Sequence, residues 1–269
     1  SNNIKVYRIG EKIIFENKLL IHLNRIIVLF FYLLKIKPRI SVGFMHSSYI
    51  DLSIASIFLN TKVVACEHIK VDHFKDRRFE LFLINLASFF INKITVVSKQ
   101  VKNKFSPFLQ RKMIVMNNII DRDDYFRNNK LKRKKIILSV GRIADQKNFL
   151  TLIKAFKIFQ NQNKSWKLII VGDGLDKVIL QNEIKSLNLT NNVKILGFTK
   201  NLKKLYCTSS IYVSPSIYES LGLTVAEALI YKLPCIGFSQ CDGVNKLIKH
   251  NLNGLLVKGD MYNHQNLAD

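Results

Sequence analysis

Residues 136–160 read IILSVGRIADQKNFLTLIKAFKIFQ and hold, in succession, a short apolar run, a charged turn and a helical pattern. The run Ile136-Ile137-Leu138 is continuous rather than alternating, which is typical of a strand covered on both faces of its sheet. Residues 149–160 predict a helix after the turn. A strand, a turn and a helix in this order indicate one unit of a parallel α/β sheet.

The same alternation runs through the whole chain and predicts two parallel sheets. Strands are predicted at residues 40–45, 62–66, 93–97 and 113–116 in the first half, and at 136–141, 167–172, 193–197, 211–214, 234–237 and 255–257 in the second. Nearly every gap is long enough for a helix. We therefore expect an α/β protein with two doubly wound, Rossmann-like domains facing a cleft, where such folds bind ligands.

A polar and highly charged segment separates the two sets of strands. Residues 121–135 read DRDDYFRNNKLKRKK and are nearly free of apolar side chains, so they predict a linker. The expected domains are residues 1–120 and residues 136–269. A chain of 269 residues is long enough for two such domains, each with its own core.

The charge of the chain is strongly positive and unevenly distributed. The 42 Lys and Arg residues against 19 Asp and Glu give +23, of which residues 1–135 carry +16 and residues 136–269 carry +7. Basic surfaces bind nucleic acid, anionic membranes or phosphorylated substrates, although a Lys-, Ile- and Asn-rich composition also arises from mutational bias. Abundant apolar residues with only 11 Gly and 4 Pro exclude a disordered or collagen-like chain.

Two apolar segments of the first half bear on membrane contact. Residues 19–36 contain an uninterrupted apolar run at 26–34 that is about half as long as a bilayer crossing requires, and residues 79–91 are similar. Both have basic flanks, so we expect either core helices or helices that rest on anionic lipid while their apolar faces pack inward. The four Cys form no C-x-x-C pair and no signal peptide is visible. We therefore expect reduced thiols and a cytoplasmic location, with peripheral attachment to the inner face of the membrane as an extension.

The turn after the predicted strand 136–141 carries residues suited to phosphate. Gly141 is followed by Arg142 and Lys147 before the next helix begins. A glycine, two cations and a helix N-terminus suit a diphosphate, since Arg supplies a planar fork and Lys a point charge.

The next strand is followed by Gly172-Asp173-Gly174. Two glycines allow a tight turn and a close approach of the backbone to a ligand. A turn in which Asp173 is the N-cap of the following helix explains the pattern equally well.

The segment 214–229, SPSIYESLGLTVAEAL, is the most specific pattern in the chain. Glu219 and Glu227 lie on either side of a junction between a loop and a helix. If that helix begins near Gly222, the free N–H groups of Leu223 and Thr224 form an anion site. Eight helical steps span about 12 Å, more than the roughly 5–10 Å between the carboxylates of a glycosidase. The pair therefore fits two carboxylates that hold different ends of one extended ligand, with a diphosphate between them.

In order along the chain, the runs GRIADQKN, VGDG, LGF and SPSIYESLGLTVAEAL resemble the family-4 glycosyltransferases, which are retaining enzymes of the GT-B fold. The resemblance covers the second half throughout and continues more weakly through the first. There it includes Glu67-His68, Val96-Val97-Ser98 and residues 116–121, where the family has a P-N-G-I-D-type segment. Each motif is weak alone, but the ordered set is specific.

The resemblance implies a role for each candidate residue. Arg142 and Lys147 would bind the donor diphosphate and stabilise the charge on the leaving nucleoside diphosphate. Glu219 would lie against the donor sugar and His68 close to the transferred sugar, and these four are the expected catalytic residues. Glu227 would accept hydrogen bonds from the ribose, and the backbone of Phe198 would shape the base pocket. The full set of expected donor-binding residues is Gly141, Gly172, Asp173, Gly174, Phe198, Gly222, Leu223, Thr224 and Glu227.

We therefore expect a retaining glycosyltransferase that moves a hexose or N-acetylhexosamine from a nucleotide sugar, with UDP as the first choice. The expected acceptor is a glycan or a polyprenyl-linked glycan in cell-surface polysaccharide synthesis. Retention through attack on the same face is expected, because no enzymatic nucleophile stands out. No cofactor and no metal are expected. Asp121-Arg122-Asp123 matches the metal-binding D-x-D pattern of another fold, but it falls in the predicted linker.

Two alternatives remain open. A nucleotide-sugar epimerase-like enzyme of the GT-B fold would release a modified sugar with no acceptor present. A basic nucleic-acid-binding protein would explain the charge, but no helix-turn-helix or aromatic platform is found, so no nucleic acid is expected as a partner.

The resemblance also sets the expected extent of the domains and the expected partners. The family's first strand and Gly-rich loop and its final helices are not found, so the first domain is expected to lack its first strands and the second its last helices. The expected partners are a nucleotide sugar, a glycan or polyprenyl-linked acceptor, and an anionic membrane surface next to the basic first half.

Overall fold

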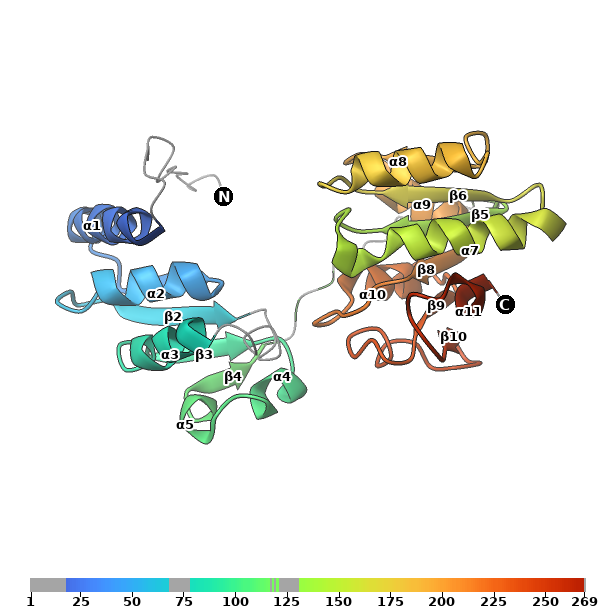
Figure 1. Cartoon of the computed structure of the whole chain (residues 1–269). Helices are drawn as coiled ribbons and strands as arrows, with labels where there is room; N and C mark the ends of the chain where they lie inside the picture. The colour runs from blue at the N-terminus through green and yellow to red at the C-terminus, as the bar shows by residue number, and fades with distance from the viewer. Residues whose placement is uncertain (1–17, 68–77, 117, 119, 121–130, 269) are drawn as a thin grey trace. The chain divides into compact units, whose positions relative to one another are not determined.

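The computed structural model describes residues 18–67, 78–116, 118, 120 and 131–268 (Figure 1). The chain divides into two compact units, Ser1–Asn118 and Ile119–Asp269. Each unit contains one parallel sheet. All ten predicted strands are present among the described residues, and no strand end is shifted by more than one residue. The prediction of an α/β protein with two parallel sheets is therefore confirmed.

The N-terminal unit has a four-stranded sheet whose strands follow one another in sequence order, β1-β2-β3-β4. Neighbouring strands are in parallel register, with Ile40 beside Lys62 and Val64 beside Lys93. The elements described in this unit are α1 (Lys18–Ile36), β1 (Ile40–Phe44), α2 (His46–Ala55), β2 (Lys62–Glu67), α3 (Arg78–Ala87), β3 (Lys93–Val96), α4 (Lys99–Asn103), α5 (Pro107–Gln110) and β4 (Met113–Val115).

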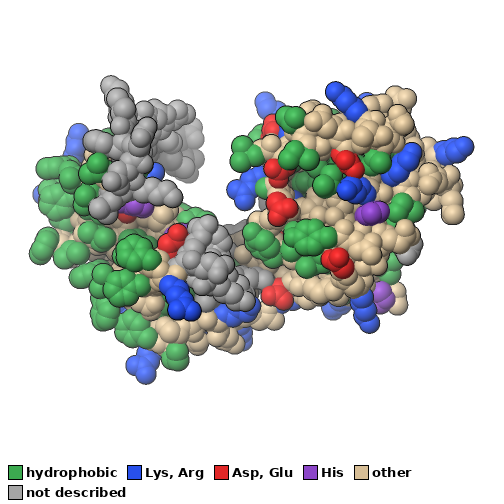
Figure 2. Space-filling model, in the orientation of Figure 1, with side chains coloured by type: hydrophobic (Ala, Val, Ile, Leu, Met, Phe, Trp, Pro, Cys, Tyr) green, Lys and Arg blue, Asp and Glu red, His purple; other side chains and the backbone are tan. Residues whose placement is uncertain are grey.

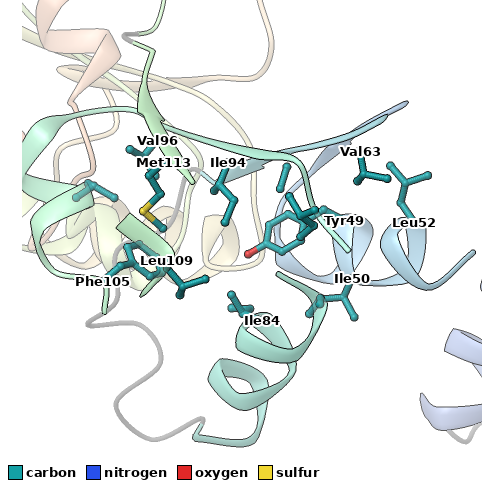
Figure 3. Packing of buried hydrophobic residues seen from close by; sticks show 14 of the residues in the cluster. Tyr49, Ile50, Leu52, Val63, Ile84, Ile94, Val96, Phe105, Leu109 and Met113 are labelled. Atoms are coloured by element: carbon teal, nitrogen blue, oxygen red, sulfur yellow. The ribbon is translucent and has the colours of Figure 1, made fainter. Parts of the chain in front are cut away.

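The helices of this unit lie on one face of its sheet, because right-handed crossovers between strands in sequence order all return on the same side. They bury a single core in which Tyr49 of α2 lies among side chains such as Ile84 of α3 and Ile94 of β3 (Figure 3). On the opposite face the side chains of Val42 and Phe44 are exposed. In the described part of this unit, helices therefore cover one face of the sheet, whereas we expected them to cover both.

The C-terminal unit has a six-stranded sheet of order β10-β9-β8-β5-β6-β7. Its described elements are β5 (Ile136–Val140), the single 3-10 turn η2 (Asp145–Lys147), α7 (Phe149–Gln162), β6 (Lys167–Val171), α8 (Lys177–Ser186), β7 (Val193–Leu196), α9 (Leu202–Thr208), β8 (Ile211–Ser214), α10 (Leu223–Ile230), β9 (Cys235–Phe238), β10 (Gly254–Val257) and α11 (His264–Ala268). The helix predicted at 149–160 is therefore present and two residues longer.

Both faces of this second sheet are covered. The neighbouring residues Ile137 and Leu138 of β5 point to opposite faces, and each belongs to a different buried cluster. One cluster contains residues of α7 and α8, and the other contains residues of α9 and α10. Arg133, inside the predicted linker, is held against this unit, since its guanidinium donates to the carbonyls of Tyr206 and Ser209.

The two apolar segments predicted as helices form α1 and α3, and α3 ends at Ala87 rather than at residue 91. Within the described residues, no helix is both long enough and apolar enough to cross a bilayer. Both helices pack one apolar face against the core of their unit. The other face also carries large apolar side chains that are exposed, such as Phe31 and Phe79. The expectation that their apolar faces pack inward is therefore correct for only half of each helix.

Candidate functional site

The order of strands in the C-terminal unit creates a switch point between β5 and β8. From β5 the chain moves outward through β6 and β7, and it then returns to place β8 on the other side of β5. The connections on the two sides of such a point lie on opposite faces of the sheet, and ligands of open α/β sheets bind there, beyond the carboxyl ends of the strands. The motif after β5 and the motif after β8 occupy the two loops at this position.

Lys147 and Glu219 meet across this switch point. Lys147 ends the 3-10 turn after β5, and its Nζ forms an ion pair with Oε1 of Glu219 in the loop after β8. The same oxygen accepts a hydrogen bond of 2.9 Å from Oγ of Ser216. The side chains of Lys147 and Glu219 are only 17% and 13% exposed. Because charges this far from solvent are weakly screened, the pair holds the two loops in one register.

Gln146 joins the same two loops through its backbone and its side chain. Its carbonyl accepts the amide of Ile217 at 3.0 Å, and its Nε2 donates to the carbonyl of Tyr218 at 2.8 Å. Gly243, after β9, lies against the backbone of Glu219, where a Cβ would come within 2.6 Å of the Glu219 carbonyl oxygen. Glu219 is therefore fixed by contacts to its side chain, to its neighbours and to its own backbone.

The glycines after β5 and β6 let two loops cross at van der Waals distance. Gly172 has φ +150°, and a Cβ on it would lie 1.8 Å from the carbonyl oxygen of Gly141. A Cβ on Gly174 would lie 2.0 Å from the carbonyl oxygen of Ile143. The close approach was expected toward a ligand, whereas in the structure these glycines approach the backbone of the neighbouring loop. The amide of Ile143 donates to the carbonyl of Asp173 at 2.9 Å.

Asp173 is not the N-cap of the following helix. The N-cap of α8 is Asp176, whose side chain makes no capping hydrogen bond, so the alternative explanation of this turn is wrong. Instead, Oδ1 of Asp173 accepts the amide of Gly174 at 2.9 Å and Oδ2 accepts Nζ of Lys177 at 3.2 Å. The backbone hydrogen bond from Gly174, and then the Lys177 ammonium, hold the pKa of the Asp173 carboxyl below its ordinary value.

Helix α10 begins four residues after Glu219 of the ion pair. Gly222 is its N-cap, in the left-handed conformation with φ 72°, so the helix start on which the expected anion site depends is present. The amides of Val225 and Ala226 donate to the carbonyl of Gly222. The amides of Leu223 and Thr224 are thus the outermost donors of the helix, in the position where an anion binds a helix N-terminus.

Glu227 lies on α10 and is held by a buried tyrosine. Its Oε2 accepts the hydroxyl of Tyr206 at 2.8 Å, and the Tyr206 ring stacks on that of Tyr231 with 5.4 Å between centroids. A second buried tyrosine, Tyr212, donates to Oγ1 of Thr224 at 2.7 Å. Burial raises the pKa of both Tyr206 and Tyr212 far above the usual range, so both hydroxyls remain protonated donors.

Three predicted site residues are not joined to this cluster. Arg142 follows Gly141 in the same loop, but it is exposed. Phe198 follows β7 and is 92% exposed. His68 lies outside the described residues. The structure therefore brings together Lys147, Glu219 and the start of α10. Gly141 lies next to the Lys147 side chain, since a Cβ added to Gly141 would be 3.2 Å from the nearest Lys147 carbon.

Sequence reasoning missed the residues that position the cluster, namely Gln146, Ser216, Tyr206, Tyr212 and Gly243. The spacing of Ser216 and Glu219 is that of a local serine–carboxylate pair and could have indicated their contact. The other contacts join residues at least 12 positions apart in the sequence, and no pattern in one sequence reports them.

Among the residues with described placement, no three His, Cys, Asp or Glu side chains gather closely enough to hold a metal ion. Asp121 and Asp123, the two carboxylates of the D-x-D match, lie outside those residues. The charged groups of the described site are thus a Lys–Glu pair, a second glutamate and the exposed Arg142, together with the partial positive charge of a helix N-terminus.

Known proteins similar to this chain are glycosyltransferases. The chain is 30% identical over 208 residues to an uncharacterized glycosyltransferase of Haemophilus influenzae, a match that covers 77% of this chain and 58% of the relative. It is 26% identical over 225 residues to a Campylobacter jejuni protein, with 83% and 62% covered. That protein is named GalNAc-alpha-(1->4)-GalNAc-alpha-(1->3)-diNAcBac-PP-undecaprenol alpha-1,4-N-acetyl-D-galactosaminyltransferase. The chain thus spans about three fifths of the length of the curated relatives it matches.

A solved structure of Anabaena Alr3699/HepE in complex with UDP and glucose superposes on this chain with a TM-score of 0.74 at 20% identity. The match covers 93% of this chain and 70% of that one. Its likeness shows the fold, which is GT-B, as the sequence predicted. The family described as glycosyl transferases group 1 matches residues 121–269, more than half of the chain. This chain therefore belongs to the group 1 glycosyl transferases.

Proposed function

We propose that the whole protein transfers a hexose or N-acetylhexosamine from a UDP-sugar to a glycan or lipid-linked glycan, with retention of configuration at the anomeric carbon. The observation that carries this proposal is the Lys147–Glu219 pair at the β5/β8 switch point, next to the N-terminus of α10. The relative named for a PP-undecaprenol substrate and the neighbour bound to UDP and glucose support the acceptor class and the nucleotide.

Each charged group of the site has a place in this reaction. The donor diphosphate binds at Lys147 and Arg142 and at the amides of Leu223 and Thr224. As the bond from the anomeric carbon to phosphate oxygen breaks, negative charge grows on the leaving phosphate. Fixed cations and helix-end amides aimed at that charge stabilise the transition state without reorganisation.

The two glutamates hold the ends of the donor. Glu227, oriented by the Tyr206 hydroxyl, accepts hydrogen bonds from the ribose. Glu219 accepts hydrogen bonds from hydroxyls of the sugar. Because Oε1 of Glu219 already faces the Lys147 ammonium and the Ser216 hydroxyl, its negative charge is partly neutralised, which makes it a poor nucleophile. This supports attack by the acceptor on the face that the phosphate leaves, with the phosphate taking the acceptor proton.

A donor screen in the full-length protein tests the proposal. UDP-glucose, UDP-galactose, UDP-GlcNAc and UDP-GalNAc would each be offered with undecaprenyl-diphosphate-linked glycans, and released UDP would be measured. We expect UDP release with one donor that depends on the acceptor, and NMR of the product should show the anomeric configuration of the donor. Conversion of the sugar with no acceptor present would instead favour the epimerase-like alternative. An inverted product would overturn the proposed stereochemistry.

A further inference from the structure

Helix α3 of the N-terminal unit is apolar on both faces. Ile84 and Ala87 point into the core and are at most 3% exposed. On the opposite face Phe79, Phe82 and Leu86 are 71%, 60% and 50% exposed. A helix that is hydrophobic all round is normally buried on all sides. Here the outer half of the helix faces solvent, and three large side chains spaced by three and four residues follow one another along it.

The exposed apolar surface continues beyond the end of α3. Phe89 and Phe90 follow the helix and are 65% and 44% exposed, and Phe108 of α5 is 42% exposed. The ring centroid of Phe108 lies 5.3 Å from that of Phe89, so α5 and the segment that follows α3 share one surface. We define the phenylalanine surface as Phe79, Phe82, Leu86, Phe89, Phe90 and Phe108. Figure 2 shows apolar side chains gathered over the N-terminal unit where α3 lies, with few acidic side chains among them.

The described charges around this surface are mostly positive. The described part of the N-terminal unit holds thirteen Lys and Arg residues and three carboxylates. Asp51 and Glu67 are 2% and 1% exposed, and Glu80 lies 3.4 Å from Nε2 of His46. By contrast Arg78, Lys93 and Arg111 are exposed, and each lies within three residues of a member of the phenylalanine surface. Among the described residues of the unit, the solvent-facing charge is therefore mostly positive.

We propose that the phenylalanine surface docks on the surface of an anionic phospholipid bilayer. The Phe rings enter the boundary between headgroups and acyl chains, and Arg78, Lys93 and Arg111 lie among the lipid phosphates. Aromatic and aliphatic side chains along one face of a helix, with cations at its borders, are the combination by which proteins bind in the membrane interface. This proposal concerns where the protein resides, and it holds whether or not the donor and acceptor proposed above are correct.

The charge and the shape of the surface favour a bilayer over other partners. A second copy of this chain would bring a positive unit against a positive unit, which opposes association. Single-stranded nucleic acid is bound by aromatic rings set in a positive groove, whereas Phe79 and Phe82 lie on the exposed face of a helix. An anionic bilayer satisfies the apolar side chains and the cations at the same time.

Sedimentation of the protein with vesicles tests the proposal. The full chain would be mixed with phosphatidylcholine vesicles that contain none or about a third phosphatidylglycerol, and the bound fraction measured against lipid concentration. We expect binding only to the anionic vesicles and weaker binding as salt is raised. The variant Phe79→Ser/Phe82→Ser/Phe89→Ser should lower the partition coefficient at least roughly 30-fold, since each ring loses its apolar contact. Arg78→Gln/Lys93→Gln/Arg111→Gln should lower it about 100-fold, or roughly fivefold for each cation.

A control variant tests whether the loss of vesicle binding is specific to the phenylalanine surface. Val178→Ser/Leu252→Ser removes two side chains of the C-terminal unit that are 63% and 77% exposed, and it should change the partition coefficient less than twofold. Circular dichroism melting should show that all three variants fold. The proposal is overturned if anionic vesicles do not bind the protein, or if the three variants bind equally. It is also overturned if the Phe and Arg/Lys substitutions abolish self-association or binding of single-stranded RNA while leaving vesicle binding intact.

Discussion

The two units are built from the same alternation of parallel strands and helices, yet they cover their sheets differently. In the C-terminal unit one buried cluster lies on each face of the sheet. In the described part of the N-terminal unit a single cluster lies on one face, and apolar side chains such as Val42 on the other face and Phe79 on the outside of α3 are exposed. The difference arises from strand order, since β1-β2-β3-β4 contains no reversal while the second sheet reverses between β5 and β8. The reversal places helices on both faces and creates the site where Lys147 meets Glu219.

Both units contain a tyrosine–glutamate hydrogen bond, but its surroundings differ between them. In each, a buried tyrosine donates to a glutamate at 2.8 Å, Tyr49 to Glu67 and Tyr206 to Glu227. Glu67 is 1% exposed and Tyr49 lies in the core, whereas Glu227 is only half-buried at the start of the proposed donor site. The same contact should therefore support stability in the N-terminal unit and ligand binding in the C-terminal unit. Substitutions in each unit would test this difference.

The largest effect is expected at the switch point. Lys147→Ala removes the cation that we assign to the leaving diphosphate and should lower kcat/KM about 10²–10³-fold, by analogy with the loss of one fixed transition-state donor. The measurement is UDP release by the full-length protein with its identified donor. Lys154→Ala, which removes a half-exposed cation paired with Glu183 on the same unit, is the control and should change the rate less than twofold. If the two substitutions lowered kcat/KM equally, the assignment of the active site to the switch point would be wrong.

The next effect concerns the crossing loops of the C-terminal unit. Gly172→Ala places a Cβ 1.8 Å from a carbonyl oxygen at a positive φ, so it should lower the free energy of unfolding by about 2–4 kcal/mol. Gly197→Ala, where the nearest atom to an added Cβ is an Asp173 oxygen at 3.9 Å, is the matched control and should change it by less than about 0.5 kcal/mol. Urea unfolding measures both. A Gly172→Ala protein as stable as the control would show that these loops do not cross closely.

A smaller effect separates the two tyrosine–glutamate pairs. Tyr49→Phe leaves a buried carboxylate without this donor and should lower the free energy of unfolding by about 1–3 kcal/mol, with UDP affinity unchanged. Tyr206→Phe should lower stability by only about 1 kcal/mol but weaken UDP binding about fivefold, because Glu227 loses the donor that orients it. Calorimetric UDP titration and urea unfolding of both variants test the contrast. It fails if Tyr49→Phe weakens UDP binding as much as Tyr206→Phe does.

The smallest effect is a pH dependence in the loop after β6. The pKa of Asp173 is lowered in the folded protein, so its contribution to stability is present above its unfolded pKa of about 4 and is lost as the pH falls through the lower folded value. The stability difference between wild type and Asp173→Asn should thus be larger at pH 7 than near pH 3. Lys177→Met should remove part of that difference, because Lys177 is the second of the two partners. If the stability difference between wild type and Asp173→Asn did not change with pH, Asp173 would not have the lowered pKa described above.

Much of the fold and part of the site were predictable from local patterns. Apolar β-branched runs such as Ile136-Ile137-Leu138 mark strands because both faces of a parallel strand are buried, and all ten predicted strands are present among the described residues. The anion-site argument required a helix start near Gly222, which is the N-cap of α10, and Lys147 and Glu219 were selected for their chemistry and for a family resemblance. Gln146, Tyr206 and Gly243 were missed, because they act on residues far from them in the sequence.

The order of the elements, the excess of positive charge and the residues that we propose bind the donor diphosphate can be read from the sequence, since each depends on residue type and short spacing. Tertiary structure alone decided which of these residues meet. The parallel pairing of β5 with β8 brings loops that are some seventy residues apart into contact, so that Lys147 pairs with Glu219. It also decided which apolar faces remain exposed, because a helix such as α3 has two apolar faces and only packing selects the one that enters the core.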